Sequence, residues 1–130
     1  MKQAVLVIED DHWVAMYMAD VIKRSFNITV FTANTGQDAT NLWHLNRQYI
    51  AAIISDIALP DNVNGETLVC DLTKEFPDLP IIFVTGGIRD KADLAKSLGR
   101  SVKLLHKPFA PIELQAALKP YIDAQGPLTV

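Results

Sequence analysis

The chain has 130 residues, of which 49% are hydrophobic and 21% are charged, and this composition is typical of one globular domain. The net charge of −3, without a dense Lys/Arg run, argues against a direct nucleic-acid contact surface. No apolar run reaches the roughly 20 residues that a membrane-spanning helix requires, and the single cysteine, Cys70, excludes an internal disulfide. We therefore expect a cytoplasmic protein that does not enter a membrane.

Five short runs with strand character occur along the chain, and each precedes a segment whose apolar residues recur at helical spacing. Three of the runs are continuously apolar, as the buried strands of a parallel sheet are. In chain order the expected strands are residues 4–8, 28–33, 51–54, 81–84 and 102–107. The expected helices contain residues 14–22, 39–43, 68–76, 94–98 and 114–121.

Residues that favour helix ends support this reading. Thr35 stands three positions before Asp38, which is the spacing of a capping arrangement, and Asn64 precedes the third helical segment. Pro111 suits the first turn of the last helix. Pro120 lies deeper in the same segment, where we expect it to kink or end the helix.

Alternating strands and helices predict an α/β fold, a doubly wound (βα)5 unit with a parallel five-stranded sheet between two layers of helices. The three purely apolar strands should lie in the middle of the sheet and the two mixed ones at its edges. This placement favours the flavodoxin-like strand order 2-1-3-4-5. We expect one domain over residues 1–124, followed by a short tail at 125–130.

Ligand sites in such folds lie beyond the carboxyl ends of the strands. Polar residues stand at these ends in four of the five expected strands. They are Glu9, Asp10 and Asp11 after the first strand, Asp56 at the third, Thr85 at the fourth, and Lys107 at the fifth.

Taken singly, these residues have ordinary explanations. The acids at 9–11 could cap the first helix, Asp56 could be a turn acid before Pro60, and Lys107 could be a solvated charge. Their joint position at one edge of the sheet favours a functional site instead.

Carboxylates gathered at one place repel one another unless a cation lies among them. Oxygen ligands without His or Cys suit Mg²⁺, and an aspartate carboxylate can attack phosphorus to form an aspartyl phosphate. A metal ion, the Thr85 hydroxyl and the Lys107 ammonium would then contact the oxygens of a transferring phosphoryl group. We predict that Asp56 is phosphorylated.

Four stretches in this order, "VLVIEDD", "SDIALP", "FVTGG" and "LLHKPF", resemble the receiver domain of response regulators in two-component signalling. The resemblance covers the chain from about Val5 to Ile122. It implies that Asp56 accepts phosphate from a histidine kinase or a histidine phosphotransfer protein. It also implies an acidic pocket of Glu9 and Asp10, and Mg²⁺ bound by Asp10, Asp56 and the backbone carbonyl of Ala58.

The same resemblance assigns the switch hydroxyl to Thr85 and the phosphate contact to Lys107, with a cis peptide bond before Pro108. Leu104 stands three residues before Lys107, at an output position where many relatives carry Tyr or Phe. The resemblance implies a signalling switch that acts on a downstream protein effector. It is not expected to be an enzyme, and its only reactions are its own phosphotransfer and autodephosphorylation. The resemblance also implies a monomer, or a weak dimer through the fourth helix, fifth strand and fifth helix.

Four alternative functions compete with this one. A flavin carrier needs a phosphate loop after the first strand, where Glu9, Asp10 and Asp11 would repel the phosphate. A phosphatase with an aspartate nucleophile usually has a second acid two residues on, where this chain has Ala58. A phosphorylation-independent scaffold with a receiver fold, and a phosphate sink that only exchanges phosphate with phosphotransfer proteins, remain open.

Overall fold

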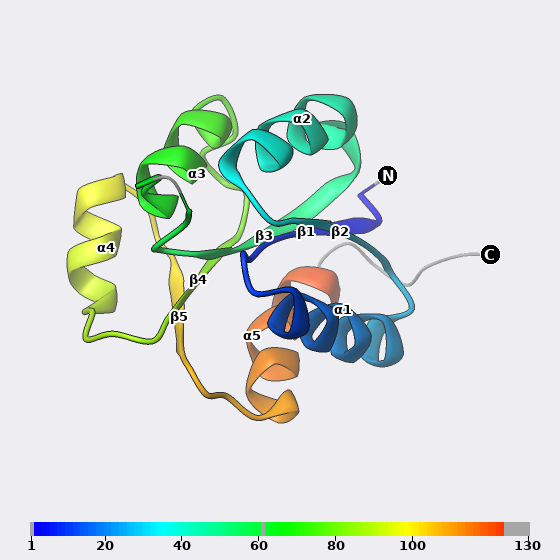
Figure 1. Ribbon diagram of the computed structural model, residues 1–130. Coiled ribbons are helices and arrows are strands. Elements are labelled where there is room, and N and C mark those ends of the chain that lie inside the picture. The colour runs from blue at the N-terminus through cyan, green and yellow to red at the C-terminus, as the bar shows by residue number, and fades with distance from the viewer. Residues whose placement is uncertain (1, 61, 124–130) are drawn as a thin grey trace.

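The computed structural model describes residues 2–60 and 62–123, so the predicted tail at 125–130 lies outside the described residues, as does Asp61. Helices and strands alternate along the chain, with one short 3-10 helix, η1, before the third strand (Figure 1). The strands are β1 (Ala4–Ile8), β2 (Thr29–Ala33), β3 (Ile50–Asp56), β4 (Ile81–Thr85) and β5 (Lys103–His106). The helices are α1 (His12–Phe26), α2 (Gly36–Asn46), η1 (Arg47–Tyr49), α3 (Gly65–Thr73), α4 (Lys91–Leu98) and α5 (Pro111–Asp123).

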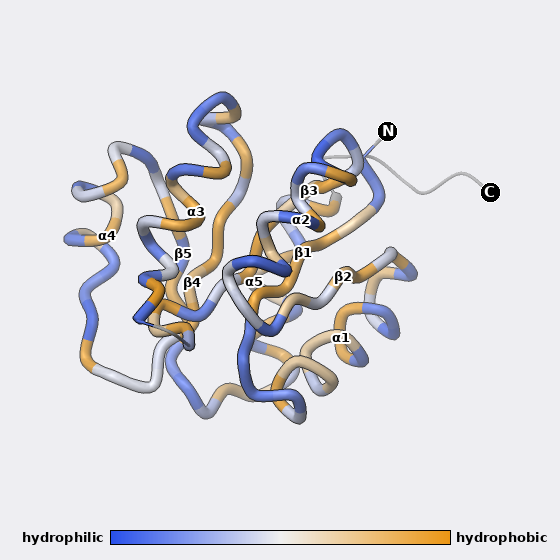
Figure 2. Tube along the Cα trace, turned by 45° about the horizontal axis from the view of Figure 1, so that its top comes forward, coloured by the Kyte–Doolittle hydropathy of each residue, from blue (hydrophilic) through white to orange (hydrophobic). Residues whose placement is uncertain are grey.

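The strands form one parallel sheet in the order β2-β1-β3-β4-β5, so the predicted fold class and strand order are confirmed. The continuously apolar strands β1, β3 and β4 are central, and the mixed strands β2 and β5 form the edges. Figure 2 shows hydrophobic strands in the interior and hydrophilic segments concentrated in the loops and on the outer helical surfaces. No helix in the described part of the chain is long and apolar enough to span a membrane.

Side chains from one strand feed two separate cores because successive residues of a strand point to opposite faces. Val5 and Val7 of β1 pack into the core beneath α1 and α5. Leu6 and Ile8 of the same strand pack into the core beneath α2, α3 and α4. Figure 1 shows α1 and α5 together on one face of the sheet and α2 and α3 on the other.

The expected helix starts are observed. The Thr35 hydroxyl accepts from Asp38 N at 3.1 Å, and the Asn64 side chain accepts from the first amides of α3. Helix α5 begins at Pro111. Pro120 was expected to kink or end the helix, and it does not end it, because α5 continues to Asp123. Pro120 lies on the exposed side, where water can satisfy the carbonyl that it leaves unpaired, while residues such as Leu118 and Ile122 hold the helix on the core.

Arg100 lies at the end of the sheet opposite the carboxyl ends of the strands, where it forms several hydrogen bonds. It follows Gly99, which ends α4 in a left-handed conformation at φ 69°. Its guanidinium donates to Thr73 Oγ1 at 3.1 Å, to the Phe76 carbonyl at 3.0 Å, and to the Leu79 carbonyl. These bonds join the end of α3 to the loop before β4, where the Phe76 carbonyl also accepts from Leu79 N.

Candidate phosphoacceptor site

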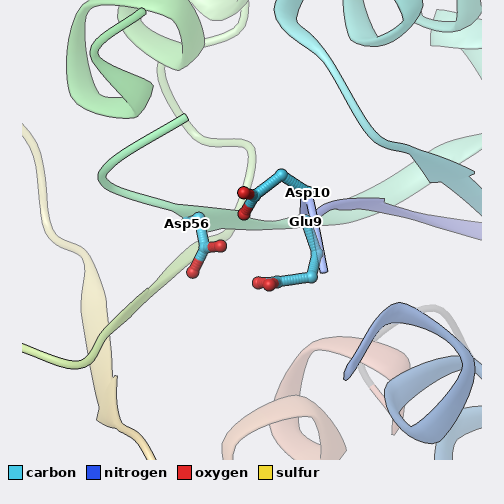
Figure 3. A group of neighbouring side chains, drawn as sticks. All are labelled: Glu9, Asp10 and Asp56. Atoms are coloured by element: carbon cyan, nitrogen blue, oxygen red, sulfur yellow. The ribbon is translucent and has the colours of Figure 1, made fainter. Parts of the chain in front are cut away.

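The carboxyl edge of the sheet gathers the predicted acids. Ligand oxygens of Glu9, Asp10 and Asp56 lie within 4.8 Å of one another, and the three side chains converge in Figure 3. Glu9 is 0% exposed and Asp56 is 5% exposed, whereas Asp10 is exposed to solvent. The pocket therefore has two buried carboxylates and one at its mouth.

The three consecutive acids at the end of β1 divide between a helix cap and the pocket. Asp11 is the N-cap of α1, and its side chain accepts from Trp13 N at 2.9 Å and from Val14 N at 3.2 Å. The helix-capping explanation is therefore right for Asp11, while Glu9 and Asp10 face Asp56.

Lys107 joins the two buried carboxylates across the sheet. Its Nζ lies 3.0 Å from Glu9 Oε1, 3.1 Å from Glu9 Oε2 and 3.0 Å from Asp56 Oδ1. Its backbone N donates to the Thr85 carbonyl at 2.7 Å, and the Lys107–Pro108 peptide bond is cis. The lysine thus crosses from the edge strand β5 to the centre of the sheet.

One ammonium does not balance the charge of this pocket. Burial and the neighbouring Glu9 raise the pKa of Asp56 to about 8, although Lys107 acts to lower it. Burial alone would lower the pKa of Lys107, but its hydrogen bonds and charge interactions with Asp56 and Glu9 outweigh burial and raise it. The site would therefore be stabilised by a further positive charge.

In the loop after Asp56, the described residues 57–60 and 62–64 make several backbone contacts. Gly65 N donates to the Ile57 carbonyl at 2.6 Å, and Ala58 forms a bridge with Asn64. A Cβ on Gly65 would lie 1.9 Å from the Asp56 carbonyl oxygen. Only glycine fits there, because any side chain would displace the backbone of the residue that carries the carboxylate.

Thr85 ends β4 beside this pocket. Its Oγ1 accepts from Gly87 N at 3.0 Å, and within the described residues it makes no hydrogen bond to Asp56. Leu104 of β5 is half-buried and packs on the core beneath α2, α3 and α4. The side chain at this position therefore contributes to core packing.

A family model of the response regulator receiver domain matches residues 5–119. The chain belongs to this family. It is thus a receiver domain of two-component signalling, a family of signalling switches.

The curated relatives of this receiver domain include both kinases and regulators. The sensor kinase CckA of Brucella abortus is 30% identical over 93% of this chain and 13% of the relative. The regulatory protein VanR of Enterococcus faecium is 29% identical over 92% of the chain and 49% of the relative. The receiver protein CpdR of Brucella abortus is 26% identical over 81% of the chain and 84% of the relative. The chain thus spans about half or less of the first two of these.

Solved structures show the same fold. The chemotaxis protein CheY4 of Vibrio cholerae superposes with a TM-score of 0.80 at 23% identity, covering 93% of this chain and 99% of that one. The receiver domain of the Francisella response regulator 1452 has a TM-score of 0.80 at 25% identity, covering 95% and 99%.

Two features near the site escaped the sequence reading. Lys107 was expected to contact phosphate, and its bidentate pairing with Glu9 was not foreseen. The ion pair between Arg89 and Glu66 was also missed. No pattern in one sequence indicates a contact between a loop and the first turn of a distant helix, whereas the position of Glu9 at the end of a strand could have indicated its pairing with Lys107.

Proposed function

We propose that Asp56 is the phosphoacceptor of this receiver domain and takes its phosphoryl group from a histidine kinase or a histidine phosphotransfer protein. The observation that carries the proposal is a buried aspartate with two acids and one lysine gathered around it. In the transfer, an Asp56 oxygen attacks phosphorus, the bond from phosphorus to the donor imidazole nitrogen breaks, and the electron pair of that bond stays on the imidazole.

The residues present fit Mg²⁺, because hard oxygen ligands converge where positive charge is lacking. We assign the ion to the Asp10 and Asp56 carboxylates and the backbone carbonyl of Ala58. When bound, Mg²⁺ would neutralise charge on the phosphoryl oxygens. Glu9 has a separate role in this scheme, since it holds the Lys107 ammonium beside Asp56.

Thr85 and Lys107 would contact the remaining phosphoryl oxygens. Lys107 already lies 3.0 Å from an Asp56 oxygen, and Thr85 would turn from Gly87 towards the phosphoryl group. Because Leu104 has no ring to rotate inward, we expect the movement of Thr85 to reach the output face through apolar packing.

Exposed apolar side chains near the site support a protein as the phosphodonor. The first turns of α1 and α5 and the loop before α4 all start at the carboxyl edge of the sheet. They carry large hydrophobic residues exposed to solvent, which commonly mark docking surfaces: Trp13 at 77%, Met16, Tyr17, Ile88 at 101%, and Ile112.

The remaining parts of the proposal follow from this role. The receiver domain occupies residues 1–124, works in the cytoplasm as a monomer or weak dimer through α4, β5 and α5, and signals to a protein effector. It acts as a switch, and its only chemistry is its own phosphotransfer and autodephosphorylation.

The first test is the intact mass of the protein after incubation with Mg²⁺ and acetyl phosphate. We expect a phosphate-sized increment that disappears in Asp56→Asn and when Mg²⁺ is chelated. Asp38→Asn, which removes a carboxylate from α2, is the matched control and should still be phosphorylated.

Leu104 favours a second candidate, a scaffold that binds partners independently of phosphate, since the aromatic residue common at this output position is missing. If no mass increment appears and beryllofluoride with Mg²⁺ also fails to bind, the scaffold replaces the switch. A phosphate sink would instead be phosphorylated normally and would capture only phosphotransfer proteins in pulldowns of the phosphorylated form.

A further inference from the structure

The loop between β4 and α4 is loosely attached to the rest of the domain. Residues 86–90 are all exposed, and the Ile88 side chain is fully in solvent. A Cβ placed on Gly86 would have no neighbour within 4 Å. The loop therefore lacks the packing that would hold it in one conformation.

This loop controls the Thr85 hydroxyl through its own backbone. Gly87 N donates to Thr85 Oγ1 at 3.0 Å, which keeps the hydroxyl oxygen on the side of the loop. The turn of Thr85 towards a phosphoryl group on Asp56, which the proposed function includes, would lengthen or break this bond. The conformation of the loop and the direction of the hydroxyl are thus coupled.

Among the described residues, we find one ion pair that joins this loop to another helix. The Arg89 guanidinium contacts the Glu66 carboxylate in the first turn of α3. Their side chains are 36% and 13% exposed, so the carboxylate is largely shielded from water. Glu66 N is in turn bonded to Asn64 Oδ1 at 2.8 Å, which makes the start of α3 a fixed anchor.

We propose that Arg89 and Glu66 are positioning residues that hold the β4–α4 loop against α3 in the resting arrangement and so oppose the turn of Thr85 towards the phosphoryl group. The inference rests on the proposed function and deepens it, because it concerns regulation of the same site. Breaking the pair removes a contact of the resting arrangement, so it shifts the population towards the active one. Glu66 belongs to α3 and directly follows Gly65, which contacts the Asp56 backbone.

The size of the effect follows from the exposure of the pair. A part-exposed ion pair contributes less than a buried one, so its loss should tighten beryllofluoride binding about threefold to tenfold. Both partners act through one contact, so the effects of removing each should not add.

The experiment measures beryllofluoride affinity in the presence of Mg²⁺ for the whole chain and three variants. These are Glu66→Gln, Arg89→Gln and the charge exchange Glu66→Arg with Arg89→Glu. The second measurement is the backbone amide resonance of Gly87, which reports its bond to Thr85 without requiring a ligand. Arg24→Gln is the matched control, because it breaks the exposed pair with Asp20 on α1.

We expect both single variants to bind beryllofluoride more tightly and to shift the unliganded Gly87 amide towards its position in the liganded wild type. The charge exchange should restore wild-type affinity, and Arg24→Gln should change neither measurement. Unchanged or weaker binding by the single variants would overturn the inference while the wild type still binds beryllofluoride. Failure of the wild type itself to bind would instead refute the proposed function.

Discussion

Two loops flank Asp56, and they are built in opposite ways. The loop from β3 to α3 is held by backbone hydrogen bonds, by the bridge of Ala58 with Asn64, and by buried Ile57 and Leu59. The loop from β4 to α4 is exposed throughout and is tied to α3 through the Arg89–Glu66 ion pair. The site thus combines a well-packed loop, the rigid side, which fixes the phosphoacceptor, with an exposed loop, the loose side, which can respond to phosphorylation.

The largest expected effect tests the rigid side. Gly65→Ala would place a methyl carbon 1.9 Å from the Asp56 carbonyl oxygen, so the backbone must shift. We expect a loss of at least about 3 kcal/mol in the free energy of unfolding, measured with urea. Gly86→Ala, in the loose loop, is the control and should change stability by less than about 0.5 kcal/mol. Equal effects of the two substitutions would remove the contrast between the loops.

The next largest effect on stability comes from the burial of the Asp56 carboxyl group. Its pKa is raised to about 8, above the 3.8 of an ordinary aspartate, so the folded state binds more protons than the unfolded chain. Stability without Mg²⁺ should therefore fall as the pH rises from about 4 to 8. Asp56→Asn removes this penalty and should be more stable than the wild type by about 2 kcal/mol at pH 8.

The same comparison at pH 5 should show a much smaller difference, because the buried carboxyl is then protonated in the wild type. Mg²⁺ at pH 8 should stabilise the wild type more than Asp56→Asn. The prediction is wrong if Asp56→Asn is the less stable protein at pH 8 in urea unfolding without metal.

The smallest stability effect tests the loose side. A Cβ placed on Gly87 would have only Thr85 Oγ1 within 4 Å, at 3.7 Å, so Gly87→Ala should leave the free energy of unfolding within about 0.5 kcal/mol of wild type. Ala58 and Gly87 are small, so an acyl phosphate on Asp56 would be open to water, and we expect a short phosphate lifetime that Gly87→Ala lengthens. The decay of the phosphorylated mass measures it, and a wild-type half-time of many hours would contradict the expectation.

The fold was readable from the sequence because its strands are distinctive. Continuous apolar runs such as 4–8 and 81–84 leave few alternatives to buried parallel strands, and the mixed runs fall at the edges. The gathering of Glu9, Asp10 and Asp56 at one edge of the sheet was predictable for the same reason, since parallel strands bring their ends together.

The remaining features depend on which groups a side chain can contact in three dimensions. The spacing of residues in the sequence does not encode these contacts. Arg100 could equally have been a solvated charge, and only the assembled fold shows that three acceptors between Thr73 and Leu79 lie within its reach. Local propensity allows Pro120 to end the helix, whereas packing of the last turn on the core lets α5 continue to Asp123.

The hydrogen bonds of Arg100 restrict how α4 can move. The end of this helix at Leu98 is followed at once by Gly99 and Arg100, which is bonded to the end of α3 and the loop beyond it. The start of α4 follows the exposed β4–α4 loop, which the Arg89–Glu66 ion pair ties to α3, and Leu94 packs its first turn into the core. We therefore expect a movement of α4 to pivot about Gly99 and Arg100, with the larger displacement in the exposed β4–α4 loop.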